Sequence, residues 1–331
     1  MRTRIMAVVV TIALATALGA CSSSKPSSGA STAPAATGTG PAATGTGGGQ
    51  TVKLGLIMKF PVDFYLTMKG AAQKWAASTP GVSLSTGIGQ SATDDQGEIN
   101  LIQSMVTQGV KGIAITPTSP AVIPALDAAV AKGVKVVLID NDLPAWTKKS
   151  SVVATDNLKG GQLAGAFIAQ HLKKGATLAV LQGVPGVPAL DDRVKGMEQA
   201  LGSSGITVVG TAPTNCDQNK GVTAAADLLS AHPDVAGIYG ACGPPTLGAI
   251  QSIQRAHHAG NLLLVGFDAL PDEVKQIVAG HETASVAQFP AKMGEMGMAA
   301  LLKAVQGQSV PPNIDTGTAI VTKANASQFG G

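Results

Sequence analysis

Charged residues, aromatic residues and cysteines are all scarce in this sequence. Charged residues make up 13% of the 331 residues and aromatic residues 3%, and the formal net charge is +3. Because no basic run occurs in the part of the chain that is expected to fold, we expect no nucleic-acid partner. The three cysteines and five histidines show no spacing typical of a zinc site, so we expect no metal and no other cofactor.

Motifs of the common enzyme classes are also missing. The sequence contains no G-x-S-x-G elbow, no H-E-x-x-H pair and no Walker-type loop. Residues 181–186 follow a predicted strand, but they lack the G-x-G-x-x-G spacing, and Pro185 is incompatible with that turn. We therefore expect a protein that is not an enzyme.

The N-terminus carries the pattern of an export signal. Arg2 and Arg4 precede an apolar stretch at residues 5–18, which is too short to favour a permanent membrane span. Residues 18–21 (Leu-Gly-Ala-Cys) resemble the bacterial lipobox, which predicts that residues 1–21 are a lipoprotein signal peptide. Cys21 would then be lipidated and become the mature N-terminus. The alternative is an ordinary cleaved signal with a chance cysteine.

Residues 22–50 consist almost wholly of Ser, Thr, Gly, Ala and Pro. This composition has too little apolar surface to offset the entropy of ordering, so it predicts a disordered tether. Together with Cys21, it predicts an extracytoplasmic domain that is anchored to the cell membrane by lipid. Several acyl chains would make that anchor stable, because a single chain binds only marginally.

From residue 51 onward, short apolar runs alternate with stretches of helical periodicity. The apolar runs predict buried parallel strands at 52–58, 82–87, 112–115, 135–139, 152–154, 177–182, 206–212, 237–240, 262–266 and 283–288, with a late strand at 319–322. Helices are predicted at 67–77, 96–108, 122–132, 157–172, 189–203, 219–231, 246–256, 271–279 and 291–306. Repeated βα units over about 280 residues predict an α/β fold with two doubly wound parallel-sheet lobes.

Polar residues directly follow several of these strands. They are Thr116, Asp140 with Asn141, Asp268 and Gln288. Ligands of open parallel sheets bind outside this edge, and a carboxylate there can accept two hydrogen bonds from a polyol. The alternative for such an Asp is to cap the next helix. Because Asp140 and Asp268 directly end apolar strands, we interpret them as binding residues.

Three aromatic residues lie close to predicted strand ends. Phe64 and Tyr65 come shortly after the first strand, and Trp146 follows the Asp140 loop. Sugars present apolar C–H faces, and a flat aromatic side chain can stack against such a face. Core packing is the usual alternative for an aromatic side chain.

The segment from 52 to about 322 resembles the type I periplasmic binding proteins of the ribose- and galactose-binding group. The resemblance depends on the order and spacing of several short segments. These are Phe64–Tyr65, Ile115–Thr118, Val137–Asp140, Thr155–Asn157 with Gly160–Gly161, Leu181–Gly183, Asp192–Arg193 with Gly196, His232–Val235, Gly266–Asp268 with Pro271–Asp272, and Ala287–Pro290.

The resemblance implies two lobes joined by a three-strand hinge, with crossovers near residues 154, 288 and 317. The N-terminal lobe would comprise 51–154 plus 289–317, and the C-terminal lobe 155–288 plus 318–331. It also implies a monomer that captures a small sugar or sugar alcohol and delivers it to an ABC permease. The alternatives are a ligand-sensing protein that presents the solute to a membrane receptor, or a sugar-modifying enzyme.

In proteins of this kind, Phe64 and Tyr65 would line the pocket from the first lobe. Asp140 and Asp268 would bind hydroxyls from opposite lobes, and Gln288 would lie on the hinge side of the cleft.

The sequence departs from the ribose pattern at four places. Asn141 and Asp191 stand where an arginine is usual, Cys216 stands where an aromatic is usual, and Cys242 with Gly243 replaces an Asn-Asp pair. The resemblance thus implies a pocket that has lost two cations and gained a carboxylate, for a polyol other than ribose. Both cysteine positions touch the ligand in the family, which implies a Cys216–Cys242 disulfide worth roughly 3 kcal/mol. Two free buried thiols are the alternative.

Overall fold

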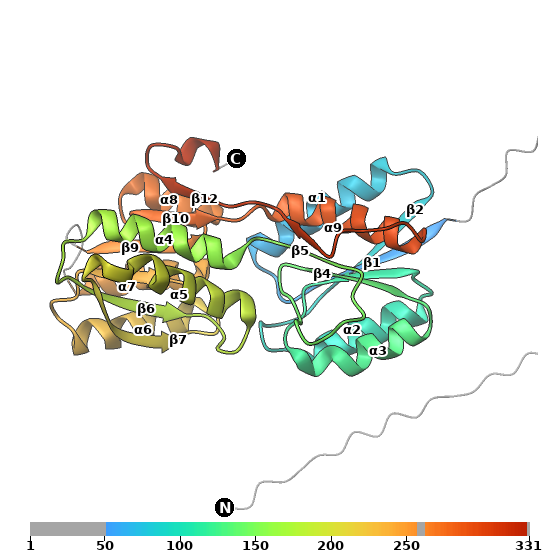
Figure 1. Cartoon of the computed structure of the whole chain (residues 1–331), viewed down its shortest axis with the longest axis horizontal. Coiled ribbons are helices and arrows are strands. Elements are labelled where there is room, and N and C mark those ends of the chain that lie inside the picture. The colour runs from blue at the N-terminus through green and yellow to red at the C-terminus, as the bar shows by residue number, and fades with distance from the viewer. Residues whose placement is uncertain (1–50, 257–261, 330–331) are drawn as a thin grey trace, which may run out of the picture. The chain divides into compact units, whose positions relative to one another are not determined.

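The computed structural model describes residues 51–256 and 262–329. The expected signal peptide at 1–21, its Cys21 and the tether at 22–50 lie outside the described residues. Within the part of the chain that the structure describes, two six-stranded sheets form the centres of two lobes (Figure 1). The predicted fold of two doubly wound α/β lobes is therefore confirmed.

The first sheet has the strand order β11-β5-β4-β3-β1-β2, and all its pairs are parallel. Its strands are β1 (Val52–Met58), β2 (Val82–Ile88), β3 (Gly112–Ile115), β4 (Lys135–Ile139), β5 (Ser151–Ala154) and β11 (Asn313–Asp315). The helices of this lobe are α1 (Asp63–Ser78), α2 (Asp95–Thr107), α3 (Ile123–Ala131) and α9 (Pro290–Val305), with a 3-10 turn at Pro120–Val122.

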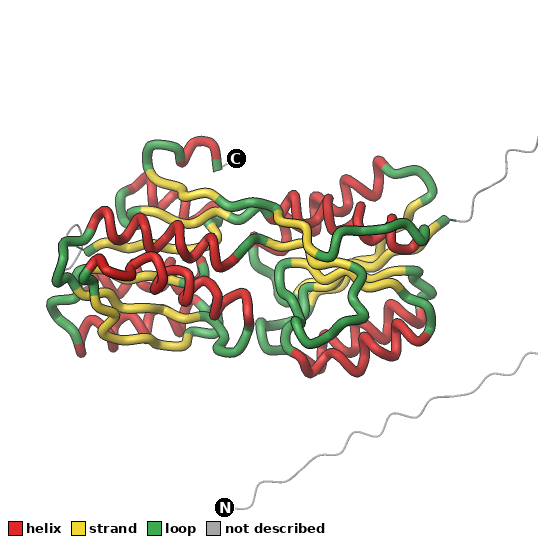
Figure 2. Tube along the Cα trace, in the orientation of Figure 1, coloured by secondary structure: helices red, strands yellow, loops and turns green. Residues whose placement is uncertain are grey.

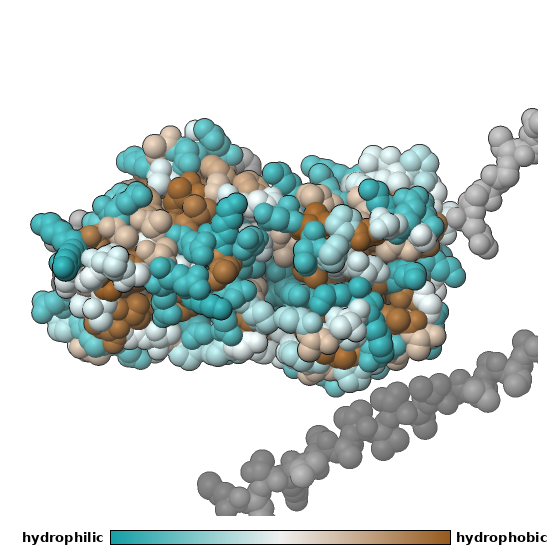
Figure 3. Space-filling view, in the orientation of Figure 1, coloured by the Kyte–Doolittle hydropathy of each residue, from teal (hydrophilic) through white to brown (hydrophobic). Residues whose placement is uncertain are grey.

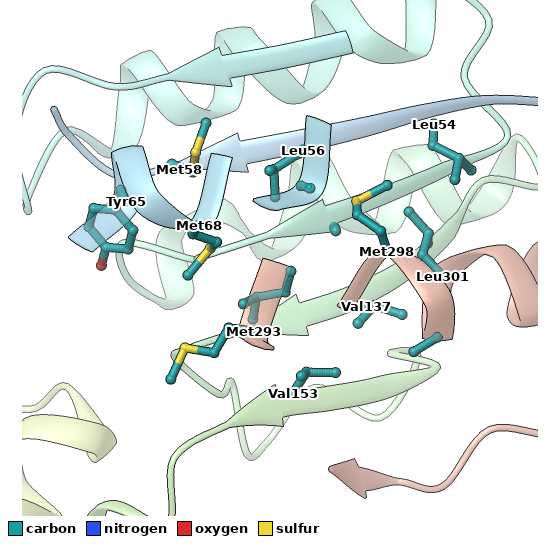
Figure 4. Packing of buried hydrophobic residues seen from close by; sticks show 14 of the residues in the cluster. Leu54, Leu56, Met58, Tyr65, Met68, Val137, Val153, Met293, Met298 and Leu301 are labelled. Atoms are coloured by element: carbon teal, nitrogen blue, oxygen red, sulfur yellow. The ribbon is translucent and has the colours of Figure 1, made fainter. Parts of the chain in front are cut away.

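Both faces of the first sheet are covered. Leu56 of β1 packs with α1 and α9 in one apolar cluster, which Figure 4 shows from close by. The next residue, Ile57, packs with α2 and α3 in a second cluster on the opposite face. Alternate side chains of a strand point to opposite faces, so a strand that is buried on both sides must be apolar throughout.

The second sheet has the order β12-β10-β9-β8-β6-β7. Its strands are β6 (Thr177–Gln182), β7 (Thr207–Pro213), β8 (Gly237–Gly240), β9 (Leu263–Asp268), β10 (Ala284–Ala287) and β12 (Ala319–Thr322). Only the edge strand β12 runs antiparallel to its neighbour among these described strands. The helices are α4 (Asn157–His171), α5 (Pro188–Leu201), α6 (Gln218–Ala231), α7 (Gly243–Arg255) and α8 (Pro271–Ala279), with 3-10 turns at Gly202–Ser204 and Ala326–Gln328.

The chain passes between the two sheets three times: from β5 to α4, from β10 to α9, and from β11 to β12 (Figure 2). On the visible face of the molecule, hydrophilic residues predominate where the lobes meet (Figure 3). No helix in the two described ranges is long and apolar enough to cross a membrane.

Most predicted elements agree with the structure to within a few residues. Two differences matter for the site. Helix α1 begins at Asp63 rather than 67, which places Phe64 and Tyr65 in its first turn. Helix α7 begins at Gly243 rather than 246, because the prolines that follow are compatible with a first helical turn.

Candidate functional site

A cavity of about 50 Å³ lies between the two lobes. Its first-lobe lining comes from residues that follow β1, β2 and β4 and from the start of α1. Its second-lobe lining comes from α5 and from residues that end or follow the strands β6 to β10. The carboxyl ends of both sheets therefore contribute to one site, as expected for open parallel sheets.

Asp140 directly follows β4 and lines the cavity from the first lobe. Its Oδ2 accepts hydrogen bonds from the Tyr65 hydroxyl (2.9 Å) and from the Asn141 amide Nδ2 (2.6 Å). Burial raises the pKa of Asp140, and the positive charges of Lys59 and Arg193 act in the opposite direction. Its Oδ1 accepts no hydrogen bond from the residues in the described ranges, so it can accept one from a ligand.

Asp268 ends β9 and lines the same cavity from the second lobe. Its Oδ1 accepts from Arg193 Nη1 (3.1 Å) and Gln288 Nε2 (2.6 Å), and its Oδ2 accepts from the backbone N–H of Gly243 (2.9 Å). The backbone at Asp140 and at Asp268 has a positive φ, of 67° and 102° respectively. Few residues with side chains adopt this region, and such outliers cluster at functional sites.

Arg193 occupies the floor of the second-lobe side with 3% of its surface exposed. Its Nε donates to Asn157 Oδ1 (2.8 Å), and its Nη1 donates to the backbone carbonyl of Ala241 (2.9 Å) as well as to Asp268. The guanidinium carbon also lies 3.9 Å from the centre of the Phe267 ring. These contacts fix the guanidinium plane beside the cavity, where it can offer its remaining N–H groups to a ligand.

Lys59 directly follows β1, lines the cavity and is 5% exposed. Burial lowers its pKa, although Asp140 and Glu98 act to raise it. Its ammonium group forms no hydrogen bond or ion pair with any residue in the described part of the chain. Glu98 is itself buried, and burial raises its pKa to about 7. Lys59 therefore places an amine beside the cavity whose N–H groups form no hydrogen bond to the described residues.

Two aromatic side chains of the first lobe border the cavity as expected. The rings of Phe64 and Tyr65 meet edge to face, with centroids 5.2 Å apart, and Phe60 meets Tyr65 in the same way at 5.4 Å. Tyr65 lies at the edge of the core cluster in Figure 4. Burial and Asp140 raise the pKa of Tyr65 well above its usual range, so its hydroxyl remains a hydrogen-bond donor.

The expected disulfide is confirmed. It joins Cys216, which follows β7, to Cys242, which follows β8, with their Cα atoms 5.6 Å apart. Both residues line the cavity.

Comparison with known proteins agrees with this geometry. Residues 54–309 match the family model described as "Periplasmic binding protein domain". The chain belongs to this family. The ribose import binding protein RbsB of Salmonella typhimurium is 32% identical over 261 residues, which cover 78% of this chain and 86% of that protein.

Solved structures of the family are also similar. An ABC transporter solute-binding protein from Mycobacterium smegmatis with bound glycerol has a TM-score of 0.79 and 31% identity, covering 85% of this chain and 97% of that chain. Another from Burkholderia graminis, in complex with D-arabinose, has a TM-score of 0.79 and 28% identity, covering 85% and 98%.

Three residues predicted to bind ligand do not line the cavity. Trp146 packs in the core beside α3, and its indole Nε1 donates to Asp127 Oδ1 (2.8 Å). Thr116 directly follows β3 and is fully buried. Asp191 accepts from Gln182 Nε2 and from the backbone N–H of Gly186, both at 3.0 Å, so its carboxylate fixes the loop after β6. Core packing and loop capping account for these positions.

Two basic residues that were not among the predicted binding residues, Lys59 and Arg193, line the cavity, whereas Asp191 does not. Sequence reasoning missed these two residues as ligand contacts. Lys59 carried a usable signal, since it follows an apolar strand as directly as Asp140 does. Arg193 lies inside α5, and no local pattern connects it with the strand ends.

Proposed function

We propose that the chain is an extracytoplasmic solute-binding protein that captures a small sugar or sugar alcohol and delivers it to an ABC importer. The proposal is carried by one observation: Asp140 of the first lobe and Asp268 of the second line the same cavity. A ligand with several hydroxyls can bond to both carboxylates at once. Binding would then hold the lobes together, and the permease would recognise this closed form.

The charges around the cavity favour a neutral ligand. Two cations, Lys59 and Arg193, are matched by two carboxylates, Asp140 and Asp268. Hydroxyl groups both donate and accept, so a polyol can use the amine and guanidinium donors and the carboxylate acceptors together. A sugar phosphate or sugar acid would add negative charge to a site that already balances its own cations.

The named relatives support transport rather than catalysis. The curated relative is a ribose import binding protein, and the similar structures carry D-arabinose or glycerol. In this proposal the ligand leaves the cleft chemically unchanged. Phe64, Tyr65, Asn141 and Gln288 would complete the binding set around Lys59, Arg193 and the two carboxylates, with Phe64 as the apolar wall.

The anchored, monomeric state is part of the same proposal. The lipid anchor is supported by the signal pattern of residues 1–21, by the lipobox-like position of Cys21 and by the tether composition of 22–50. Labelling of cells with a radioactive fatty acid should mark the wild-type protein and leave Cys21→Ser unmarked. Equal labelling of both proteins would contradict a lipid anchor at Cys21.

A thermal-shift screen over pentoses, hexoses and alditols tests the binding role. A ligand present at about 100 times its dissociation constant stabilises the folded state by about 2.7 kcal/mol, which raises the melting temperature by several degrees. Mass spectrometry of the recovered ligand should show an unchanged compound. A screen in which no sugar or alditol shifts the transition, or in which the ligand is converted, would contradict the proposal.

A further inference from the structure

The second-lobe lining of the cavity is divided into a polar and an apolar part. The sheet order β12-β10-β9-β8-β6-β7 places β9 and β10 next to each other, and these strands carry Asp268 and Gln288 at their carboxyl ends. The strands β8, β6 and β7 follow on the other side. The loop residues that line the cavity after these three strands are Cys242, Val184 and Cys216, and the helices that follow add Pro244, Leu190 and Arg193.

These three residues and Leu190 of α5 form a continuous apolar surface, which we call the sulfur wall. Gly183 brings them together, because it presents no side chain. A Cβ atom at Gly183 would lie 2.6 Å from Leu190 Cδ1 and 3.0 and 3.1 Å from the two sulfur atoms. The disulfide therefore lies against the backbone at the end of β6.

Arg193 belongs to the polar part of the lining, because its Nη1 donates to Asp268. The other polar side chains near the sulfur wall are Thr214, Gln182 and Asp191, and their hydrogen-bonding groups are engaged within the protein. The Thr214 hydroxyl donates to the carbonyl oxygen of Gln182 (2.7 Å), and the Gln182 amide donates to Asp191. Asp191 accepts in addition from the Gly186 N–H. Thr214, Gln182 and Asp191 do not line the cavity. A ligand hydroxyl directed at the sulfur wall would thus lose its bonds to water and gain no equivalent partner.

We propose that the sulfur wall makes the site selective for polyols that lack a hydroxyl group at one end. This inference deepens the proposed function and rests on it. The hydroxylated end binds Asp140, Asp268, Arg193 and Lys59, and a methyl or bare C–H end contacts the disulfide. A buried hydroxyl without a partner weakens binding roughly 10- to 100-fold, which sets the expected preference.

Matched ligand pairs that differ by one terminal hydroxyl test this selectivity. The probes are D-fucose with D-galactose and 5-deoxy-D-ribose with D-ribose, and dissociation constants are measured by calorimetry on the wild-type protein. We expect the deoxy member of at least one pair to bind about tenfold more tightly. Dissociation constants for an alditol series from glycerol to xylitol serve as the control for ligand length. Each of these alditols keeps its terminal hydroxyl groups, so the series changes the length of the ligand alone.

Val184→Thr adds a hydroxyl to the sulfur wall without changing side-chain shape and leaves the disulfide intact. Val187→Thr is the matched control, because Val187 belongs to the same apolar cluster but does not line the cavity. The deoxy preference is the ratio of the dissociation constants of the hydroxylated and the deoxy sugar. We expect Val184→Thr to lower this ratio by about threefold or more, and Val187→Thr to leave it unchanged.

The paired cysteine variants give a second comparison. In Cys216→Ala with Cys242→Ala the surface remains apolar, and in Cys216→Ser with Cys242→Ser it becomes polar, while both lose the disulfide. We expect only the serine pair to narrow the preference. Equal or tighter binding of the hydroxylated sugars by the wild type, or identical selectivity of Val184→Thr and Val187→Thr, would overturn the inference. Failure of every sugar and alditol to bind would overturn the proposed function as well.

Discussion

Asp140 and Asp268 share an unusual backbone conformation, although they come from different lobes. Asp140 directly follows one buried strand and Asp268 ends another, and their φ angles are positive, at 67° and 102°. Such a conformation costs a residue with a side chain about 1–3 kcal/mol, which glycine would avoid. We infer that a carboxylate is kept at both positions because the site needs one.

Asp268→Asn tests the charge at this position without changing the backbone preference, since asparagine also tolerates positive φ. Asp268 accepts three hydrogen bonds, from Arg193, Gln288 and Gly243, through its two carboxylate oxygens. The amide of asparagine has only one oxygen, so at least one of these bonds is lost. The buried Arg193 also loses its hydrogen-bonded counterion. We expect ligand affinity, measured by calorimetry, to fall about 10- to 100-fold. The control is Asp272→Asn at an exposed surface pair, which should leave the affinity unchanged.

Lys59→Met separates binding from stability. Burial is the largest influence on the Lys59 pKa and lowers it, so the folded state disfavours the charge relative to the unfolded state. A lowered lysine pKa means that the charge destabilises the fold at pH values below the folded pKa. We expect Lys59→Met to be at least as stable as wild type near neutral pH, by urea unfolding, and to bind the ligand about tenfold more weakly.

Lys53→Met is the matched control for this variant, because Lys53 lies on the same strand with an exposed side chain. Lys53→Met should change neither the free energy of unfolding nor the ligand affinity. Weaker binding in both variants would assign the effect to overall charge rather than to the position of Lys59. Loss of stability in Lys59→Met would show that its attraction to Asp140 and Glu98 exceeds the cost of burial.

Strand ends were the part of the site that the sequence could predict. Asp140, Asp268 and Gln288 directly follow or end apolar strands, and Lys59 would have been found by the same rule. Trp146 does not line the cavity, because the loop after β4 returns its indole to the core, where its Nε1 donates to Asp127. Arg193 could not be found in this way, because its position depends on how two helices pack.

Helices α4 and α5 approach each other through glycines. A Cβ atom at Gly161 of α4 would overlap the backbone carbonyl oxygen of Arg193, and one at Gly165 would overlap that of Met197. A Cβ atom at Gly196 of α5 would likewise overlap the carbonyl oxygen of Leu158. Small residues therefore set the distance of α5 from α4, and with it the position of the Arg193 guanidinium.

Gly161→Ala should displace α5 and Arg193 together. Overpacking of this kind costs typically about 1–3 kcal/mol, so we expect a lower free energy of unfolding in urea and weaker ligand binding. Gly70→Ala in α1 is the control, because no atom lies within 4 Å of its Cβ position. That change should stabilise the helix by roughly 0.5–1 kcal/mol and leave binding unaltered. A Gly161→Ala variant with unchanged stability and unchanged ligand binding would contradict the close approach of α4 and α5.

A buried pair of carboxyl groups supports the loop that follows β9. Glu273 accepts from the Leu270 N–H (2.8 Å) and from the Ser285 hydroxyl (3.0 Å), and Ser285 in turn accepts from the Ala269 N–H. Glu282 accepts no hydrogen bond from the described residues. Burial, followed by the negative charge of Glu273, raises the pKa of Glu282 well above its usual range. The two carboxyl groups can therefore share a proton.

This pair makes stability depend on pH. The folded state keeps a proton that the unfolded chain releases above about pH 4.5, so the free energy of unfolding falls as pH rises from there to the folded pKa. Glu282→Gln stays neutral at every pH. We expect it to exceed the wild type in stability at about pH 8, with a gain that shrinks toward pH 4. The control is Glu198→Gln, a change at an exposed side chain. Its free energy of unfolding, measured over the same pH range, should equal that of the wild type.

The alternation of strands and helices was enough to predict the fold of the whole molecule, but not every strand. β11 was missed because Asn313–Asp315 is too short and polar to form an apolar run. Its place is set by long-range contacts with β5. Asp315 then accepts from the backbone N–H of Asp156 (3.3 Å) and of Gly317 (2.8 Å), which ties two of the three crossovers to each other.

Ligand binding should draw the two lobes together, because Asp140 and Asp268 belong to separate sheets that only these crossovers connect. We expect the radius of gyration in solution, measured by X-ray scattering, to decrease when the strongest binder of the screen is added. Asp140→Asn removes the first-lobe charge and keeps the second-lobe contacts, so it should need more ligand for the same decrease. Asp142→Asn, next in the same loop but outside this cavity, should respond like the wild type. A ligand that binds tightly while the radius of gyration stays constant would show that one lobe alone supplies the affinity.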